Sequence, residues 1–268
     1  MNTARSFLFV PGDRPDRFDK AVAAGSDCTI LDLEDAVNPS DKHAARQAVK
    51  AWLDTGNRAA LRINPPGTEF YQDDLALVSH PNLTAVLLPK AESPDECRAI
   101  LSRMNDGISL LPLIESSTGV LRAAEIAAVP GVARLLFGSV DFMTECGITD
   151  DTCGLLHARS VLVLASTAAG LAGPVDGVTL ALDDDDQLAA DCAAARGLGM
   201  GGKLCIHPRQ VKGVNAGFSP SDGEIEQARR IVTAAEEAGA KGAIRLDGKL
   251  VDIPVVVRAR RLLEQAGG

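Results

Sequence analysis

The sequence predicts an α/β protein: a (β/α)8 TIM barrel with a short C-terminal helical and hairpin extension. Eight short apolar runs of strand length alternate with segments of helical periodicity. The length of 268 residues and the 46% hydrophobic composition suit one barrel of roughly 250 residues. We therefore expect a single domain over residues 1–268, with the barrel at about 5–218 and the extension at about 219–268.

The predicted strands are apolar runs bounded by turn signals. They cover residues 6–11, 28–35, 59–64, 85–90, 109–115, 134–141, 174–180 and 203–207. Continuous apolar runs are typical of parallel strands that are buried on both faces. A doubly wound open sheet is the competing architecture, but it rarely needs eight parallel strands in a chain of this length.

The predicted helices follow the strands and carry apolar residues at helical spacing. They cover about 15–24, 39–52, 69–79, 94–104, 119–129, 155–169 and 185–198. The acidic run 183–186 is expected at the start of the last of these, because acidic side chains are favoured at helix N-termini. After the barrel we expect a helix at 224–238, a hairpin at the Asp247-Gly248 turn and a helix at 254–265.

Composition excludes some classes of partner. A net charge of −9 argues against nucleic acid and against an anionic membrane surface. No apolar run approaches the roughly 20 residues of a membrane span, so a cytoplasmic location is the expectation. The six cysteines contain no C-x-x-C pair, which favours buried free thiols over disulfides or zinc.

Charged and polar residues fall at the predicted C-terminal strand ends, where barrels of this kind place their active sites. They are Asp32, Glu34, Asp35, Arg62, Asn64, Lys90, Glu115, Asp141 and His207. In an extended strand, Asp32 and Glu34 would point to one side and Asp35 to the other. His207, next to Pro208, is better explained as a hydrogen-bonded structural histidine than as a metal ligand.

Glu115 and Asp141 end two neighbouring predicted strands, and their sequence neighbours include no histidine or cysteine ligand. Two carboxylates of this kind suit Mg²⁺, with Mn²⁺ as the alternative. Arg62 offers a planar fork for a carboxylate or an oxyanion. A metal and an arginine above a barrel can stabilise an enolate, as carbon–carbon cleavage beside a carbonyl requires. Alternatively, the two acids cap the following helices or pair with Arg62.

Six ordered segments carry a resemblance to a known family. They are residues 7–12, 32–37, 61–64, 113–115, 137–142 and 205–208. In order and spacing they resemble the citrate lyase β-subunit-like family, within the wider group of HpcH/HpaI aldolases and malyl-CoA and citramalyl-CoA lyases. The resemblance implies a Mg²⁺-dependent barrel, usually a homotrimer. Such an enzyme cleaves a malyl-, citramalyl- or citryl-like 3-hydroxyacyl-CoA thioester to acetyl-CoA and a 2-oxo acid, through a metal-stabilised enolate.

The resemblance also implies roles for particular residues. Glu115 and Asp141 match the metal ligands, and Arg62 matches the arginine that binds the substrate and acts in catalysis. Glu34 and Asp35 match an acidic pair near the metal and are the catalytic candidates for proton transfer. The residues expected to bind substrate are Arg62, Glu115, Asn64, Arg14 and Lys90. Arg14 and Lys90 match positions at which members of the family lie close to CoA.

Two departures from the family pattern bear on the reaction. Residues 142–147 read FMTECG where relatives commonly have aspartate-leucine-glycine, so the loop at the acyl end is expected to differ. Full malyl-CoA and citramalyl-CoA lyases carry a longer C-terminal lid that supplies a catalytic aspartate to the neighbouring subunit, which leaves the general acid/base unassigned here. The alternative functions are an acyl-CoA thioester hydrolase, a 2-oxo acid aldolase, and a citrate lyase subunit that depends on an acyl carrier protein. The charge of −9 argues against a docked acidic carrier.

Overall fold

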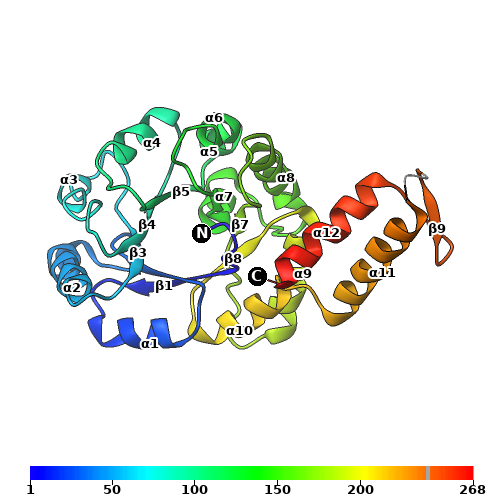
Figure 1. Cartoon of the computed structure of the whole chain (residues 1–268). Helices are drawn as coiled ribbons and strands as arrows, with labels where there is room; N and C mark the ends of the chain where they lie inside the picture. The colour runs from blue at the N-terminus through cyan, green and yellow to red at the C-terminus, as the bar shows by residue number, and fades with distance from the viewer. Residues whose placement is uncertain (240–241, 268) are drawn as a thin grey trace. The chain divides into compact units, whose positions relative to one another are not determined.

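The computed structural model describes residues 1–239 and 242–267 and confirms the predicted barrel (Figure 1). Eight parallel strands close in sequence order from β1 to β8. They are β1 (Ser6–Pro11), β2 (Cys28–Asp32), β3 (Ala59–Arg62), β4 (Leu83–Leu88), β5 (Ser109–Ile114), β6 (Leu136–Phe137), β7 (Val175–Asp176) and β8 (Gly202–Cys205). All the C-terminal strand ends therefore open at one mouth of the barrel.

Helices surround the strands (Figure 1). The α-helices of the barrel are α1 (Phe18–Ala23), α2 (Lys42–Asp54), α3 (Tyr71–Asp74), α4 (Pro94–Leu101), α5 (Ser117–Leu121), α6 (Ala123–Ala127), α7 (Ser139–Cys146), α8 (Cys153–Ala168), α9 (Asp185–Leu198) and α10 (Pro208–Gly217). Single 3-10 turns, η1 (Pro15–Arg17) and η2 (Pro39–Asp41), begin with proline and precede α1 and α2. Asp184 caps α9 through Gln187, which confirms the role expected for the acidic run.

The inside of the barrel is filled with side chains. Alternate strand residues point inward, and they come from every strand. The buried cluster contains Phe7, Cys28, Ile30, Ala60, Ala85, Leu87, Leu111, Leu113, Leu136, Val175 and Leu204. All of these residues are buried, so the lumen is a packed core and the chemistry is confined to the mouth.

Two predicted strands are much shorter than expected. The prediction of a strand over 134–141 is wrong beyond Phe137, because Gly138 turns the chain into α7 and puts Asp141 in the first turn of that helix. The seventh strand stops at Asp176 instead of reaching residue 180. A side chain at Gly177 would collide with Ser139, so this glycine lets the end of β7 approach the start of α7.

Two predicted helices are also interrupted. The helix expected at 69–79 forms only the single turn α3. The helix expected at 119–129 is broken at Arg122, whose backbone lies outside the helical region, into α5 and α6. Helices α1, α2, α4, α8 and α9 lie within a few residues of their predicted positions, whereas α7 and α10 were not predicted from the sequence.

The chain divides into two compact units, Met1–Asn215 and Ala216–Gly268. In the second unit, α11 (Asp222–Ala238) packs on α12 (Ile253–Gly267), and β9 (Ile244–Leu246) pairs antiparallel with β10 (Lys249–Val251). Asp247 and Gly248 both have positive φ, which confirms the predicted hairpin turn. Over the described part of the chain, no helix has the length and apolarity needed to cross a membrane.

Candidate active site

Arg62 is the buried cation at the centre of the barrel mouth. Its Nε and Nη2 donate to the two oxygens of Asp32 at 2.7 and 2.6 Å. The pairing of β2 with β3 sets these two residues side by side. The guanidinium also lies over the Phe9 ring, 4.6 Å from its centroid. A bidentate pair packed on an aromatic face fixes the plane of the fork, and the Nη groups keep further N–H donors for another partner.

The segment after β2 is a turn rather than a strand, which corrects the expected alternation of Asp32, Glu34 and Asp35. Glu34 N donates to Asp32 Oδ1 at 2.8 Å and bends the chain back over the strand end. As a result all three acids surround one guanidinium: Arg62 Nη1 lies 2.8 Å from Glu34 Oε2 and 3.7 Å from Asp35 Oδ2. Asp32 and Glu34 are buried, whereas Asp35 is exposed.

Lys42 stabilises the turn formed by residues 32–35. Its Nζ donates to the carbonyl oxygens of Leu33 and Glu34 and to Asn64 Oδ1, each at 2.7 Å. The lysine is buried at the first position of α2, and burial lowers the pKa of its ammonium. The role of Lys42 in positioning the site was not predicted from the sequence.

Asn64 belongs to the same buried network. Its Nδ2 donates to Asp74 Oδ2 at 2.6 Å and to Leu33 O at 3.0 Å, while its Oδ1 accepts from Lys42. Arg46 Nη1 contacts the other oxygen of Asp74 at 3.1 Å. Both polar atoms of the Asn64 amide are engaged, and the residue does not line the pocket at the barrel mouth. Its geometry is that of a residue that positions the acidic turn, rather than the expected substrate contact.

Glu115 follows β5 directly and is buried against the barrel mouth. Its Oε1 accepts from Lys90 N at 2.8 Å. Gly138 passes so close that any side chain there would meet the Glu115 carboxylate. Burial, together with the nearby Asp141, raises the pKa of Glu115 to about 7 against the opposing effects of the Lys90 hydrogen bond and of Arg62. The two predicted metal ligands, Glu115 and Asp141, line the same pocket at the barrel mouth.

Asp141 is presented by a helix, and its carboxylate faces solvent at the pocket edge. Within the described residues, no side chain caps the start of α7, because Gly138 occupies the N-cap position. The first N–H groups of a helix lack helical partners and carry partial positive charge. Gly138, Ser139 and Val140 line the same pocket as Arg62, so these donors border it.

A cavity of about 360 Å³ unites these groups. Its polar lining comes from β2, β3, β5 and α7, and its apolar lining from β1 and β5 to β8. The lining residues are Phe9, Pro11, Asp32, Asp35, Ala36, Arg62, Leu113, Glu115, Phe137, Gly138, Ser139, Val140, Asp141, Val178, Leu204 and Ile206. Five of the predicted strand-end residues, Asp32, Asp35, Arg62, Glu115 and Asp141, meet here, and Glu34 contacts Arg62 just beside them.

The remaining predicted residues lie outside this cavity. Arg14 is exposed and pairs with Asp16 through Nε at 3.2 Å. Lys90 is exposed, with a positive φ of 47° that aims its N–H at Glu115. His207 Nδ1 accepts from Arg209 N at 3.2 Å, in agreement with a structural histidine.

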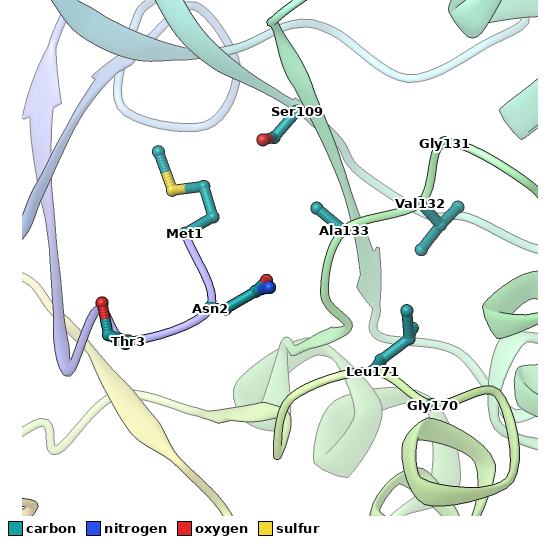
Figure 2. Close-up of a pocket in the computed structure, with 9 residues that line it drawn as sticks. All are labelled: Met1, Asn2, Thr3, Ser109, Gly131, Val132, Ala133, Gly170 and Leu171. Atoms are coloured by element: carbon teal, nitrogen blue, oxygen red, sulfur yellow. The ribbon is translucent and has the colours of Figure 1, made fainter. Parts of the chain in front are cut away.

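A larger cavity of about 540 Å³ lies at the opposite end of the barrel, where the strands begin (Figure 2). Figure 2 shows Met1 and Asn2 beside Ser109, Ala133 and Leu171. Its lining brings no acidic, basic, histidine or cysteine side chain together. The smaller cavity at the C-terminal strand ends is therefore the candidate active site, despite its size.

The donor set at this mouth suits a hard divalent cation. Acidic side chains outnumber the single Arg62, and Glu34 Oε2 is buried without an aligned hydrogen bond. Burial, together with Glu115, Asp35 and Asp32, raises the pKa of Glu34 to about 8 against the opposing charge of Arg62. Across the described residues no three His, Cys, Asp or Glu side chains cluster as metal ligands. An ion held by Glu115 and Asp141 would complete its coordination with water or substrate oxygens, as Mg²⁺ commonly does.

Two acids that suit Mg²⁺, Glu115 and Asp141, share the barrel mouth with Arg62, and this arrangement is that of a metal-dependent active site. The family of the chain follows from its similarity to known proteins. Residues 5–208 match the HpcH/HpaI aldolase/citrate lyase family. The chain belongs to this family. It is 36% identical to a (3S)-malyl-CoA thioesterase of Cereibacter sphaeroides over 98% of this chain and 94% of that protein. It is also 36% identical to a citrate lyase subunit beta-like protein of Deinococcus radiodurans, over 97% and 96% of the two chains.

Among solved structures, the chain is similar to Mycobacterium tuberculosis CitE in complex with magnesium, acetoacetate and coenzyme A. The two share 34% sequence identity with a TM-score of 0.88, and the match covers 100% of both chains. This similarity agrees with the barrel fold and with the family resemblance inferred from the six motifs.

Proposed function

We propose that this chain is a Mg²⁺-dependent carbon–carbon lyase. It would cleave a malyl-, citramalyl- or citryl-like 3-hydroxyacyl-CoA thioester to acetyl-CoA and a 2-oxo acid. The observation that carries the proposal is the single cavity in which Arg62 meets Glu115 and Asp141. The ligands of the CitE complex, a keto acid and coenzyme A with magnesium, support the same chemistry.

Arg62 is suited to bind the oxygen that gains negative charge as the carbon–carbon bond breaks. Asp32 and Phe9 already hold its guanidinium in place, so little reorganisation is needed when charge develops. Glu115 and Asp141 would hold Mg²⁺ on the same side of the cavity. When bound, the ion would supply Lewis-acid polarisation of the substrate's oxygens.

The start of α7 is suited to the carboxylate of the 2-oxo acid. Gly138, Ser139 and Val140 line the cavity beside Asp141, and the N-cap position has no side chain to occupy the helix N–H groups. Anions are favoured at such a terminus by both the free donors and the helix dipole. A carboxylate there would lie in the same cavity as Arg62 and the acidic pair.

Glu34 is the better placed of the two proton-transfer candidates. It is buried against Arg62 and has a pKa of about 8, so it can hold or release a proton near neutral pH. Asp35 is exposed and more distant from the guanidinium. We assign Glu34 as the proton-transfer residue and Asp35 as a carboxylate that holds water at the mouth.

The second candidate function is acyl-CoA thioester hydrolysis on the same site. It is favoured by the name of the Cereibacter sphaeroides relative, a (3S)-malyl-CoA thioesterase that matches nearly the whole chain. A 2-oxo acid aldolase and a carrier-dependent citrate lyase subunit stay as further alternatives. The homotrimer, the acyl carrier partner and the cytoplasmic location also stay predictions.

Product analysis separates the two leading candidates. Purified protein is incubated with malyl-CoA or citramalyl-CoA and Mg²⁺, with or without EDTA, and the products are identified by mass spectrometry. The lyase predicts acetyl-CoA with glyoxylate or pyruvate, lost on chelation. Free CoA with the intact hydroxy acid would instead establish the hydrolase. Asp141→Asn is the metal-site control, and full turnover by that variant would contradict the assignment.

A further inference from the structure

Three apolar side chains line one side of the candidate active site. Val140 lies in the first turn of α7, Val178 follows β7 and Ile206 follows β8. We call these three residues the apolar rim. They line the same cavity as Arg62 and Glu115, so whatever binds the charged groups also meets the rim.

Two of the three rim side chains are exposed to solvent, and Val178 is partly buried. Val140 is 39% exposed and Ile206 is 40% exposed. Below them, Leu113, Phe137 and Leu204 form a buried apolar floor of the cavity. Apolar surface continuous with a polar binding site is typical of a ligand subsite, because covering it with ligand removes it from water.

A buried glutamine fixes the rim in place. Gln210 Oε1 accepts from Ile206 N at 3.0 Å and from His207 N at 3.3 Å, while its Nε2 donates to Thr179 O at 2.8 Å. Thr179 Oγ1 in turn donates to Asp191. One side chain thus ties the residue after Val178 to Ile206, and the rim keeps its shape without a ligand.

The surroundings of the rim favour an alkyl group over a phosphate. The acids and Arg62 come from β2, β3, β5 and the α7 turn, whereas Val178 and Ile206 follow β7 and β8. Lys203 and Arg209 each lie three residues from Ile206 in sequence, and each is paired with an acid: Lys203 Nζ with Asp176 at 3.2 Å and Arg209 Nη1 with Asp183 at 2.5 Å. The exposed basic residues Arg14 and Lys90 follow β1 and β4 instead.

We infer that the apolar rim is an alkyl subsite, so that the 2-oxo acid handled by this enzyme carries an alkyl chain beyond its carbonyl carbon. The inference rests on the proposed function and narrows its substrate class. The enzyme discriminates in favour of alkyl-bearing 2-oxo acids and against glyoxylate, which has no carbon to place on the rim.

The test is a binding series of free 2-oxo acids with the full chain and saturating Mg²⁺, measured by isothermal titration calorimetry. The ligands are glyoxylate, pyruvate, 2-oxobutyrate and 2-oxovalerate. Each added carbon that reaches the rim should tighten binding by about fourfold, the effect of burying one CH₂ group. Val178→Thr keeps the shape of the side chain but adds a hydroxyl, and Ile206→Thr is a second, independent variant. Val22→Thr, on the exposed face of α1, is the matched control.

The expected result is a graded series in the wild type and in Val22→Thr, and a flattened series in both rim variants with unchanged affinity for glyoxylate. A flat series in the wild type, or an unaltered gradient in both variants, would overturn the alkyl subsite while the proposed function stands. A flat series combined with weaker CoA binding by Ile206→Thr would assign the rim to the CoA arm and also overturn it. If no acid binds with Mg²⁺, the proposed function fails, and the subsite with it.

Discussion

The buried Asp32–Arg62 pair gives the most quantitative prediction, through the substitution Asp32→Asn. Each oxygen of Asp32 accepts two hydrogen bonds: Oδ1 from Arg62 Nε and Glu34 N, and Oδ2 from Arg62 Nη2 and Ala36 N. Whichever way the asparagine amide turns, its NH₂ group meets two of these donors. The variant therefore loses two hydrogen bonds at a fully buried site.

A hydrogen bond to a charged group contributes about 1.5–3 kcal/mol. Losing two of them should lower the free energy of unfolding by about 3–6 kcal/mol, out of the 5–15 kcal/mol typical of natural proteins. With a urea m-value of about 3 kcal/mol/M, the unfolding midpoint should fall by about 1–2 M. Circular dichroism in a urea titration measures this shift, and equal m-values would show that only stability changed.

Asp16→Asn is the matched control, because Asp16 also meets an arginine fork but at the surface. Arg14 Nε and Nη2 approach its two oxygens at 3.2 and 3.3 Å, and both side chains are exposed. We expect its midpoint to stay at the wild-type value, since exposed ion pairs are screened by water. A wild-type midpoint for Asp32→Asn as well would refute the conclusion that Asp32 anchors Arg62.

Four further predictions concern the metal site, its pH dependence, the arginine and the thiols. Glu115→Gln and Asp141→Asn should each weaken Mn²⁺ binding by about 100-fold, because each removes one of two protein ligands; electron paramagnetic resonance measures free Mn²⁺, and unaltered binding would count against the site. Since burial raises the pKa of Glu115 to about 7, Mg²⁺ must displace a proton below that pH, and its affinity should fall by up to about tenfold per pH unit there and level off above it. Calorimetry in buffers of different ionisation enthalpy would detect the released proton, and an affinity flat from pH 5.5 to 8 would contradict this coupling. Arg62→Ala should reduce turnover by roughly 100-fold or more with Mn²⁺ still bound, whereas equal loss of both would mean that the arginine only supports the fold. Only Cys146 and Cys153 are exposed among the six cysteines, so a thiol reagent should modify two groups in the native protein and six after unfolding; rapid modification of more than two would show that the barrel opens.

The sequence predicted the barrel because its strongest signals are local. Continuous apolar runs and following helices identify β1 to β5 and β8 within a few residues. The errors at β6 and β7 have a common origin. Gly138 lets the chain pass close to Glu115, and Gly177 lets it pass close to Ser139. Both contacts depend on which strands and helices lie next to each other in the folded barrel. The residues around each glycine do not indicate these contacts, so the short lengths of β6 and β7 could not be inferred from the sequence.

Within the candidate site, the residue types were easier to predict than their partners. Arg62 and the acids stand out because charged residues end apolar runs. The engagement of Asn64 with Lys42 and Asp74 could not be inferred, because Lys42 and Asp74 come from separate helices. Asp32 was recognised as a strand-end acid, but its role as the partner of Arg62 was missed. The pairing of β2 with β3, in which Asp32 is opposite Arg62, is the signal that could have revealed it.

The central claim is that Glu115 and Asp141, brought together from the end of β5 and the start of α7, hold one divalent ion beside Arg62. The most direct measurement is a crystal structure of the protein with Mn²⁺ and pyruvate, using the anomalous signal of manganese to locate the ion. The account predicts one strong anomalous peak between the two carboxylates, with pyruvate bound to it and within hydrogen-bonding distance of Arg62. A manganese peak elsewhere, or pyruvate bound away from Arg62, would contradict it.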